Sequence, residues 1–181
     1  MAALKLLSLV LVLLHVLDAA VVPCPWTHFR LRVLNEESIA LLEKMGNLMP
    51  QKCLEEGGRT FPDEVFVNAQ NEDVVVLALE TLSGVDRIFK NQQTSVTWNR
   101  EHLELFKNII SSRQVPHLQK CAGEAVSQRG EGSVAELKSY FEKLEETLKK
   151  KGFSECAWEK VRDEVHHGLS KFHQFLQKTT N

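Results

Sequence analysis

The C-terminal stretch from Phe153 to Leu176 constrains the fold more than any other part of this 181-residue chain. Its apolar residues recur every three or four positions, the spacing that places side chains along one side of a helix. They are Trp158, Val161, Val165, Leu169, Phe172 and Leu176. Charged and polar residues lie between them, and Cys156 stands near the start. The stretch therefore predicts a long helix with one buried side and one polar side that could bind a partner.

Four further segments show the helical period, over residues 27–48, 71–90, from 98 past 116, and 133–151. Pro116 should bend or interrupt the third of them, because its ring removes a backbone donor. Ser133 and Glu136 predict a capping box at the start of the fourth. Gly152 should end that helix, and Ser154 should cap the next one. The last two helices are therefore expected to be antiparallel neighbours.

The segment over residues 49–70 lacks periodicity and contains two prolines and two glycines. Such a connection can cross the length of a bundle and join two helices that run in the same direction. No segment convincingly resembles a strand, because the apolar register around Val74 to Leu79 extends too far at helical spacing. The pattern predicts an all-α fold of five helices in one domain, residues 21–181.

The first twenty residues have the features of a secretory signal peptide. Lys5 supplies a positive start, a short apolar run follows, and Ala19 and Ala20 provide small residues for cleavage. The rest of the chain has no apolar run of the roughly 20 residues that a membrane helix needs. We therefore expect residues 1–20 to be removed and the protein to be secreted.

Four cysteines follow the leader, and they are Cys24, Cys53, Cys121 and Cys156. An even number in an exported domain predicts two disulfides, with three pairings that spacing alone cannot separate. No C-x-x-C pair occurs, which argues against a zinc ribbon or a redox motif.

The chain contains no motif of an enzyme active site. G-x-S-x-G, H-E-x-x-H and a phosphate-binding glycine loop are all absent from the sequence. His166 and His167 are adjacent, so on a helix they point about 100° apart and cannot chelate one metal ion together. The formal net charge of −2 argues against general binding of nucleic acids. We expect no catalysis, no metal and no cofactor.

The stretch YFEKLEETLKKKGFSECAWEKVRDEV, from Tyr140 into the last helix, resembles the signature region of vertebrate type I interferons. Its central motifs are Cys-Ala-Trp-Glu at 156–159 and Val-Arg-Asp-Glu at 161–164. The match continues upstream through LQKC around Cys121, Cys53-Leu54 and Phe61-Pro62. With four cysteines in the family's order, the chain is most similar to four-cysteine fish members.

The resemblance implies the fold of a long-chain helical cytokine, up-up-down-down with a long crossover after the first helix. It also implies one set of disulfides, Cys24 with Cys121 and Cys53 with Cys156. The separations are 121 − 24 = 97 and 156 − 53 = 103 residues, so each bridge closes a long loop.

The resemblance further implies a secreted, monomeric antiviral cytokine that joins two receptor chains and activates Janus kinases and STAT proteins. One receptor chain would contact the first helix, the crossover and the last helix, and the other would contact the opposite side. Neither nucleic acid nor membrane insertion is implied. The receptor-contacting positions correspond to Leu54, Arg59, Arg162, Asp163, His166, His167 and Ser170. His166 and His167 depart from the family, because mammalian members have apolar or permanently basic residues there.

Two other functions stay open. Another long-chain helical cytokine or hormone would require a different cysteine pairing, and a secreted carrier of a lipid or small ligand would require a sizeable internal cavity. For Arg162 the alternative to a receptor contact is a surface ion pair with a neighbour on the helix, Glu159 or His166, worth a few tenths of a kcal/mol. As a receptor contact, Arg162→Ala should weaken binding by roughly 1–3 kcal/mol with little change in melting temperature.

Overall fold

The computed structural model describes residues 27–56, 58–90, 96–122 and 131–179. The expected leader, residues 1–20, and Cys24 lie outside these ranges. Within them the chain forms helices and turns and contains no strand, as the sequence predicts.

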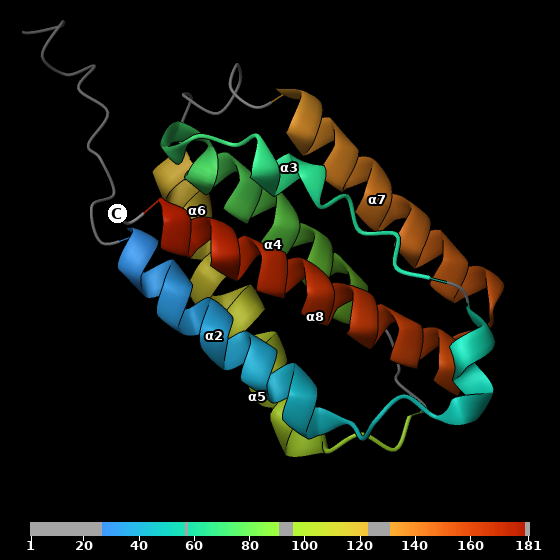
Figure 1. The fold of residues 1–181 in the computed structure, drawn as a ribbon. Helices are drawn as coiled ribbons and strands as arrows, with labels where there is room; N and C mark the ends of the chain where they lie inside the picture. Colours follow the sequence, from blue (N-terminus) through green and yellow to red (C-terminus); the bar gives the residue numbers. More distant parts are fainter. Residues whose placement is uncertain (1–26, 57, 91–95, 123–130, 180–181) are drawn as a thin grey trace, which may run out of the picture.

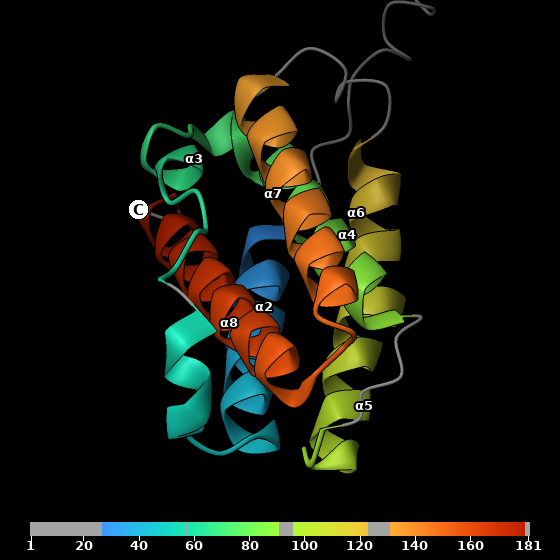
Figure 2. The same ribbon diagram turned by 90° about the vertical axis from the view of Figure 1, so that its right-hand side faces the viewer.

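The bundle consists of five long helical segments in the described ranges. They are α2 (Thr27–Met45), α4 (Val74–Lys90), a composite segment of α5 (Arg100–Asn108), η3 (Ile109–Gln114) and α6 (Val115–Ala122), α7 (Glu131–Lys150) and α8 (Glu155–Lys178). Helices α2, α4 and α7 run in one direction, and α5–α6 and α8 run in the other (Figures 1 and 2). When α7 is left aside, α2, α4, α5–α6 and α8 run up, up, down and down, as the family resemblance implies.

The crossover between α2 and α4 contains only short helical pieces. They are η1 (Gln51–Glu56), α3 (Glu64–Val67) and η2 (Asn71–Asp73). This segment starts beside the N-terminal end of α8 and then follows α8 on the side of α7 (Figure 1). It therefore connects two parallel helices by running along the outside of the bundle.

Helix α8 provides the centre of the core. The six residues of its predicted apolar stripe are each at most 2% exposed. The stripe packs against α2 and α4, while α4 also packs closely against α7. Burial of large apolar side chains contributes roughly 1.5–3 kcal/mol each, so this one helix accounts for a large share of the core.

The turn between α7 and α8 matches its sequence signals. Gly152 has a φ of 59°, in the left-handed region. The Phe153 N–H donates to the Leu148 carbonyl and the Gly152 N–H to the Lys149 carbonyl, each at 3.0 Å, which forms a Schellman cap. The Ser154 hydroxyl accepts from the Ala157 N–H at 3.3 Å and caps α8. The two helices are therefore antiparallel neighbours.

The start of α7 differs from the sequence-based expectation. The helix begins at Glu131, so Ser133 lies inside its first turn and the predicted capping box with Glu136 is wrong. Glu131 places a carboxylate at the N-terminal end of the helix, where the helix dipole favours a negative charge.

Pro116 does not interrupt its helical segment. The residues before it form a π-helix, Ile109–Gln114, and the Val115 N–H donates to the Ile110 carbonyl five residues back. The wider turn accommodates the proline, which lacks an N–H and would crowd the preceding turn of a regular α-helix.

One of the two disulfides implied by the family resemblance is present. Cys53 in η1 is bonded to Cys156 in α8, with Cα atoms 5.0 Å apart and a sequence separation of 103. No cysteine in the described ranges is free. The pairing of Cys121 with Cys24 stays a prediction, because Cys24 lies outside those ranges.

We predict that removing this bridge in a Cys53→Ser/Cys156→Ser variant lowers the free energy of unfolding by about 4 kcal/mol. The reason is that the bridge closes a loop of about a hundred residues and so restricts the unfolded chain. Urea denaturation followed by circular dichroism measures the change. Lys52→Ala, beside the bridge, should stay within about 0.5 kcal/mol of the wild type, and a similarly small loss in the double variant would contradict the prediction.

Candidate binding surface

The polar side of α8 forms one continuous surface with the crossover and the C-terminal end of α2. We call it the α8 surface and define it by Leu54, Arg59, Asp163, His166, His167 and Ser170. The following contacts determine where each of these residues lies.

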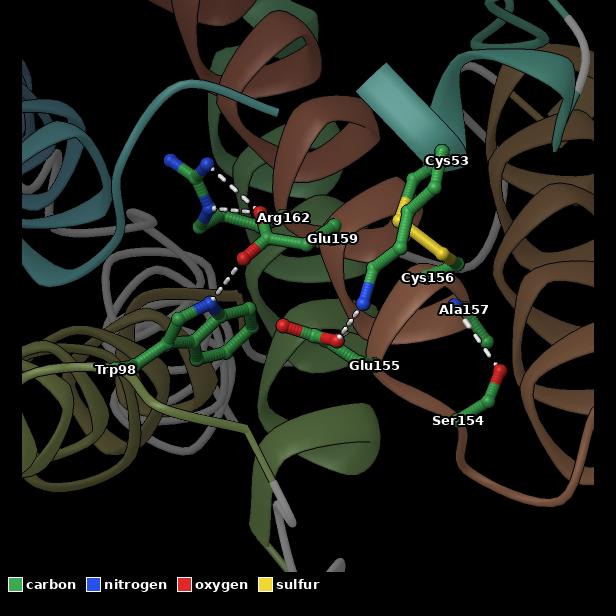
Figure 3. The surroundings of a disulfide bond; sticks show 9 residues. Cys53, Trp98, Ser154, Glu155, Cys156, Ala157, Glu159 and Arg162 are labelled. Carbon is green, nitrogen blue, oxygen red and sulfur yellow. Dashed lines mark hydrogen bonds and ion pairs between the residues drawn. A yellow bond between two sulfur atoms is a disulfide. The ribbon is translucent and has the colours of Figure 1, made fainter. Parts of the chain in front are cut away.

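The disulfide attaches η1 to the first turn of α8 (Figure 3). Beside it, the Lys52 ammonium lies 2.6 Å from the Glu155 carboxylate. Cys53 is fully buried, whereas its neighbour Leu54 is 62% exposed. The bridge therefore holds an apolar side chain in solvent next to α8.

A buried carboxylate, Glu164, fixes the next part of the crossover. It is 0% exposed and accepts from three segments. The donors are the Thr60 N–H of the crossover at 2.9 Å, the Tyr140 hydroxyl of α7 at 2.8 Å, and the Lys160 ammonium of α8 at 2.9 Å. Lys160 also donates to the Gly58 carbonyl at 2.6 Å. A buried charge requires such partners, so the crossover, α7 and α8 are held together here.

Tyr140 stays protonated in this arrangement. Burial, the negative charge of Glu164 and the hydrogen bond to it raise the pKa of Tyr140 far above its usual range. The hydroxyl can therefore act as a donor to Glu164 at every physiological pH.

Phe61 attaches the crossover to the middle of α8. Its ring lies directly over Gly168, where an added Cβ would come within 2.5 Å of the Phe61 Cε2 atom. The ring also contacts Tyr140 edge-on, with centroids 5.0 Å apart. Gly168 therefore permits an approach of the crossover that a larger residue would prevent.

His167 belongs to an ion-paired cluster with the crossover. Its Nε2 atom lies 2.8 Å from Asp63, and the Lys171 ammonium lies 2.8 Å from the other oxygen of the same carboxylate. Partial burial acts to raise the pKa of Asp63, but the hydrogen bonds from Lys171 and His167 and their charges outweigh it and lower the pKa below its ordinary value. Asp63 is therefore stabilised in its charged form.

Arg59 and Asp163 form a two-point contact across the surface. The Arg59 Nε and Nη2 atoms lie 3.3 and 3.2 Å from the two Asp163 oxygens. The arginine side chain remains 56% exposed and the aspartate 31%. The pair orients both groups, yet a partner could still reach them.

His166 lies on the opposite side of α8, toward α2. Its Nε2 atom is 3.0 Å from the Glu43 carboxylate, which is itself largely exposed. Ser170, one turn further along α8, donates its hydroxyl to the His166 carbonyl at 2.8 Å. Both histidines of the adjacent pair thus face acidic residues from other segments.

Arg162 differs from the rest of the predicted set because its side chain is only 13% exposed. It contacts the Glu159 carboxylate at 2.8 Å, and the other oxygen of Glu159 accepts from the Trp98 indole N–H at 2.7 Å (Figure 3). It also donates to the Leu42 carbonyl at 3.0 Å and to the Asn47 carbonyl. Its donors are directed into the protein.

These contacts cap the C-terminal end of α2. The last four carbonyls of a helix have no partner within that helix. Here Arg162 donates to the Leu42 carbonyl, and the Asn99 N–H donates to the Met45 carbonyl at 2.7 Å. The His102 ring lies 3.2 Å from the Lys44 carbonyl. Arg162 therefore stabilises a helix terminus, so the alternative of a purely superficial ion pair is wrong. For the same reason we no longer expect Arg162→Ala to leave the melting temperature nearly unchanged.

The surface presents an exposed apolar side chain, Leu54, and partly exposed charged side chains, Arg59 and Asp163. Within the described ranges, no three His, Cys, Asp or Glu side chains are grouped so that they could hold a metal ion. No helix in those ranges combines the length and apolar character needed to cross a membrane.

Three acidic residues that organise this surface carry no distinctive sequence signal. Glu164 stands between Asp163 of the polar side of α8 and Val165 of its apolar stripe, and Asp63 lies in the non-periodic crossover. Glu43 is on the polar side of α2. Only the Val-Arg-Asp-Glu motif at 161–164 pointed toward Glu164, and without the fold it gave no reason to expect a buried carboxylate.

The chain resembles known interferons along most of its length. The family described as the interferon alpha/beta domain matches residues 27–179. Interferon a3 of Oncorhynchus mykiss is 30% identical over 152 residues, which cover 82% of this chain and 82% of the relative.

Two solved structures resemble the fold. Zebrafish interferon 1 superposes with a TM-score of 0.72 at 28% identity, covering 86% of this chain and 99% of that structure. Zebrafish interferon 2 gives a TM-score of 0.69 at 30% identity, covering 79% and 97%.

We predict that Arg162→Ala lowers the free energy of unfolding by about 3 kcal/mol, because it removes the cationic partner of the buried Glu159 carboxylate and the donor to two backbone carbonyls. The exposed Arg59→Ala variant should change stability by no more than about 0.5 kcal/mol. Urea denaturation of both variants measures the difference. Equal stability of the two would contradict the capping role of Arg162.

We also predict an acid-dependent contribution from Asp63. Because its folded pKa lies below 3.8, its contribution is fully present above that value and disappears as the pH falls through the folded pKa. The stability difference between the wild type and Asp63→Asn should therefore shrink on acidification below 3.8. Urea denaturation in a series of buffers measures it, and a difference that grows toward low pH would refute the assignment.

Proposed function

This chain belongs to the interferon alpha/beta family, and we propose on that basis that it joins two different type I interferon receptor chains on one cell. The joined receptors would activate Janus kinases and STAT proteins and induce antiviral genes. We further propose that residues 1–20 are removed as a signal peptide, and that the secreted protein acts as a monomer.

Family membership establishes the general class of this protein. It is a type I interferon, and members of this family are secreted cytokines of antiviral defence that bind receptors and are not enzymes. The disulfide Cys53–Cys156 agrees with the pairing expected for this family and disfavours a hormone with a different pairing. The receptor pair and the contact residues belong to the proposal.

The observation that supports the proposal most strongly is the attachment of the crossover to α8. The disulfide, Glu164 and Phe61 hold the crossover against three successive parts of the helix. Leu54, Arg59 and Asp163 therefore belong to one rigid surface although they lie up to 109 residues apart (163 − 54). A surface arranged before binding loses little conformational entropy when a receptor docks.

Within this surface we assign recognition to the exposed residues. Leu54 offers an apolar anchor, and Arg59 and Asp163 offer charges beside it, the combination typical of an interface centre with a polar rim. His166, His167 and Ser170 would extend the contact along α8. Arg162 would support binding indirectly, by holding α2 and α8 in place.

The second receptor chain would bind the other side of the bundle, formed by α4, α5–α6 and α7. Helices α4, α5 and α6 lie behind the layer of α2 and α8 in Figure 1, and α7 lies to the upper right of α8. Arg87 of α4 and Glu145 of α7 form an ion pair at 3.1 Å there. Two separate sides are what simultaneous binding of two receptors requires.

Exchanging the charges of one pair at a time tests both surfaces. Arg59→Asp/Asp163→Arg can keep an ion pair within the protein while it reverses the charges presented to a partner. We expect this variant to keep its melting temperature and to bind one receptor ectodomain at least about tenfold more weakly. Arg87→Glu/Glu145→Arg is the matched control, because it should weaken binding to the other ectodomain instead.

Surface plasmon resonance with each purified ectodomain gives the two affinities, and STAT phosphorylation in responsive cells gives the combined effect. Either exchange should reduce phosphorylation. Unchanged affinity for both ectodomains after the first exchange would exclude Arg59 and Asp163 from the interface. Weakening of the same ectodomain by both exchanges would refute the two-sided arrangement.

A further inference from the structure

A groove separate from the α8 surface lies between α7, the first two turns of α8 and the crossover. Its volume is about 570 Å³, within the range of pockets that bind small molecules. The bottom is apolar and consists of Leu144 and Leu148 from α7 and Ala157 and Val161 from α8. Gly58, Thr60 and Pro62 of the crossover form one wall.

The rim of the groove is mainly cationic. Lys143 of α7, Lys151 of the turn after α7 and Lys160 of α8 line it, and the lining includes one acidic side chain, Glu136. The Lys160 ammonium pairs with Glu164 and donates to the Gly58 carbonyl, and its side chain is only 14% exposed. Lys143 is exposed, and its apolar stem can cover a ligand while its ammonium contacts an anionic group.

The wall formed by the crossover is fixed. Thr60 is held by Glu164, whose other partners include Tyr140, and Tyr140 itself lines the groove. The groove is therefore a defined cleft with a rigid side, an apolar bottom and positive charge at its edge. The lining extends over about four turns along α7 and its C-terminal end, whereas on α8 it consists of Ala157, Lys160 and Val161, so the apolar bottom lies along the C-terminal half of α7.

We propose that this groove binds a small amphipathic anion, with an alkyl chain on the apolar bottom and a carboxylate at the rim near Lys143. Burial of each methylene contributes about 0.8 kcal/mol in transfer from water, and the cationic rim selects the sign of the head group. The ligand would contact Gly58 and Thr60, the two neighbours of Arg59. None of the residues that define the α8 surface lines the groove, although Arg59 lies between two residues that do.

A titration with sodium dodecanoate below its micelle concentration tests the proposal. Amide resonances of Thr60, Thr147 and Val161 should shift and saturate in nitrogen–proton correlation spectra, and amides of α5 should not. Dodecylamine and dodecan-1-ol carry the same chain with a positive or a neutral head group. Dodecanoate should bind at least about tenfold more tightly than dodecylamine, and equal affinity would overturn the assignment of an anion site.

Two substitutions locate the ligand. Thr147 lines the groove and is exposed, and its hydroxyl donates to the Lys143 carbonyl within the same helix. Thr147→Trp should therefore fill the groove without unfolding the protein and abolish the shifts. Lys143→Ala should weaken binding about fivefold or more, whereas Lys138→Ala, on the same helix outside the groove, should not.

Circular dichroism confirms that each variant is folded before it is titrated. Saturable binding that survives Thr147→Trp, or no saturable shift in the wild-type protein, would refute the proposal. If Thr147→Trp weakens receptor binding while the wild type binds no dodecanoate, the groove serves a protein partner and the small-anion site is likewise refuted.

Discussion

The carboxylate of Glu164 is the constraint on which the arrangement of the bundle's outer surface depends. It is fully buried, and a buried charge is tolerated only when its oxygens are satisfied. Its donors come from the crossover, α7 and α8, so it can be satisfied only when Thr60, Tyr140 and Lys160 converge. The disulfide and Phe61 reinforce this position on either side. A segment with little regular structure thereby becomes a fixed part of the molecule.

This attachment separates the polar residues of α8 into two groups with different functions. Glu159 and Arg162 face α2 and Trp98 and hold the bundle together, although the sequence places them on the polar side of the helix. Asp163 and Ser170 lie nearer to solvent, and Asp163 is oriented by Arg59 of the crossover. Receptor recognition in our proposal relies on the second group, while the first group determines whether the surface exists at all. The groove on the α7 side depends on the same attachment, because the crossover forms its wall.

The sequence predicts most of this fold because the responsible signals are local. Helical periodicity and the residues Gly152 and Ser154 suffice for α8 and for the turn before it. The disulfide followed from the family resemblance. Local sequence patterns did not predict where α7 starts or that a π-helix precedes Pro116. Both features depend on backbone hydrogen bonds, which many different sequences can form. The roles of Glu164 and Arg162 were also beyond local patterns, because their partners lie about 104 and 120 residues away in the chain.

Hydrogen exchange at the Thr60 amide tests the central claim most directly. Thr60 lies outside every helix, so an unattached crossover would leave its N–H open to solvent. If Glu164 holds the crossover as described, this amide should exchange slowly, with an opening free energy within about 1 kcal/mol of the amides in the middle of α8. Exchange at the rate of an unstructured peptide would contradict the account, because the crossover would then move independently of α8.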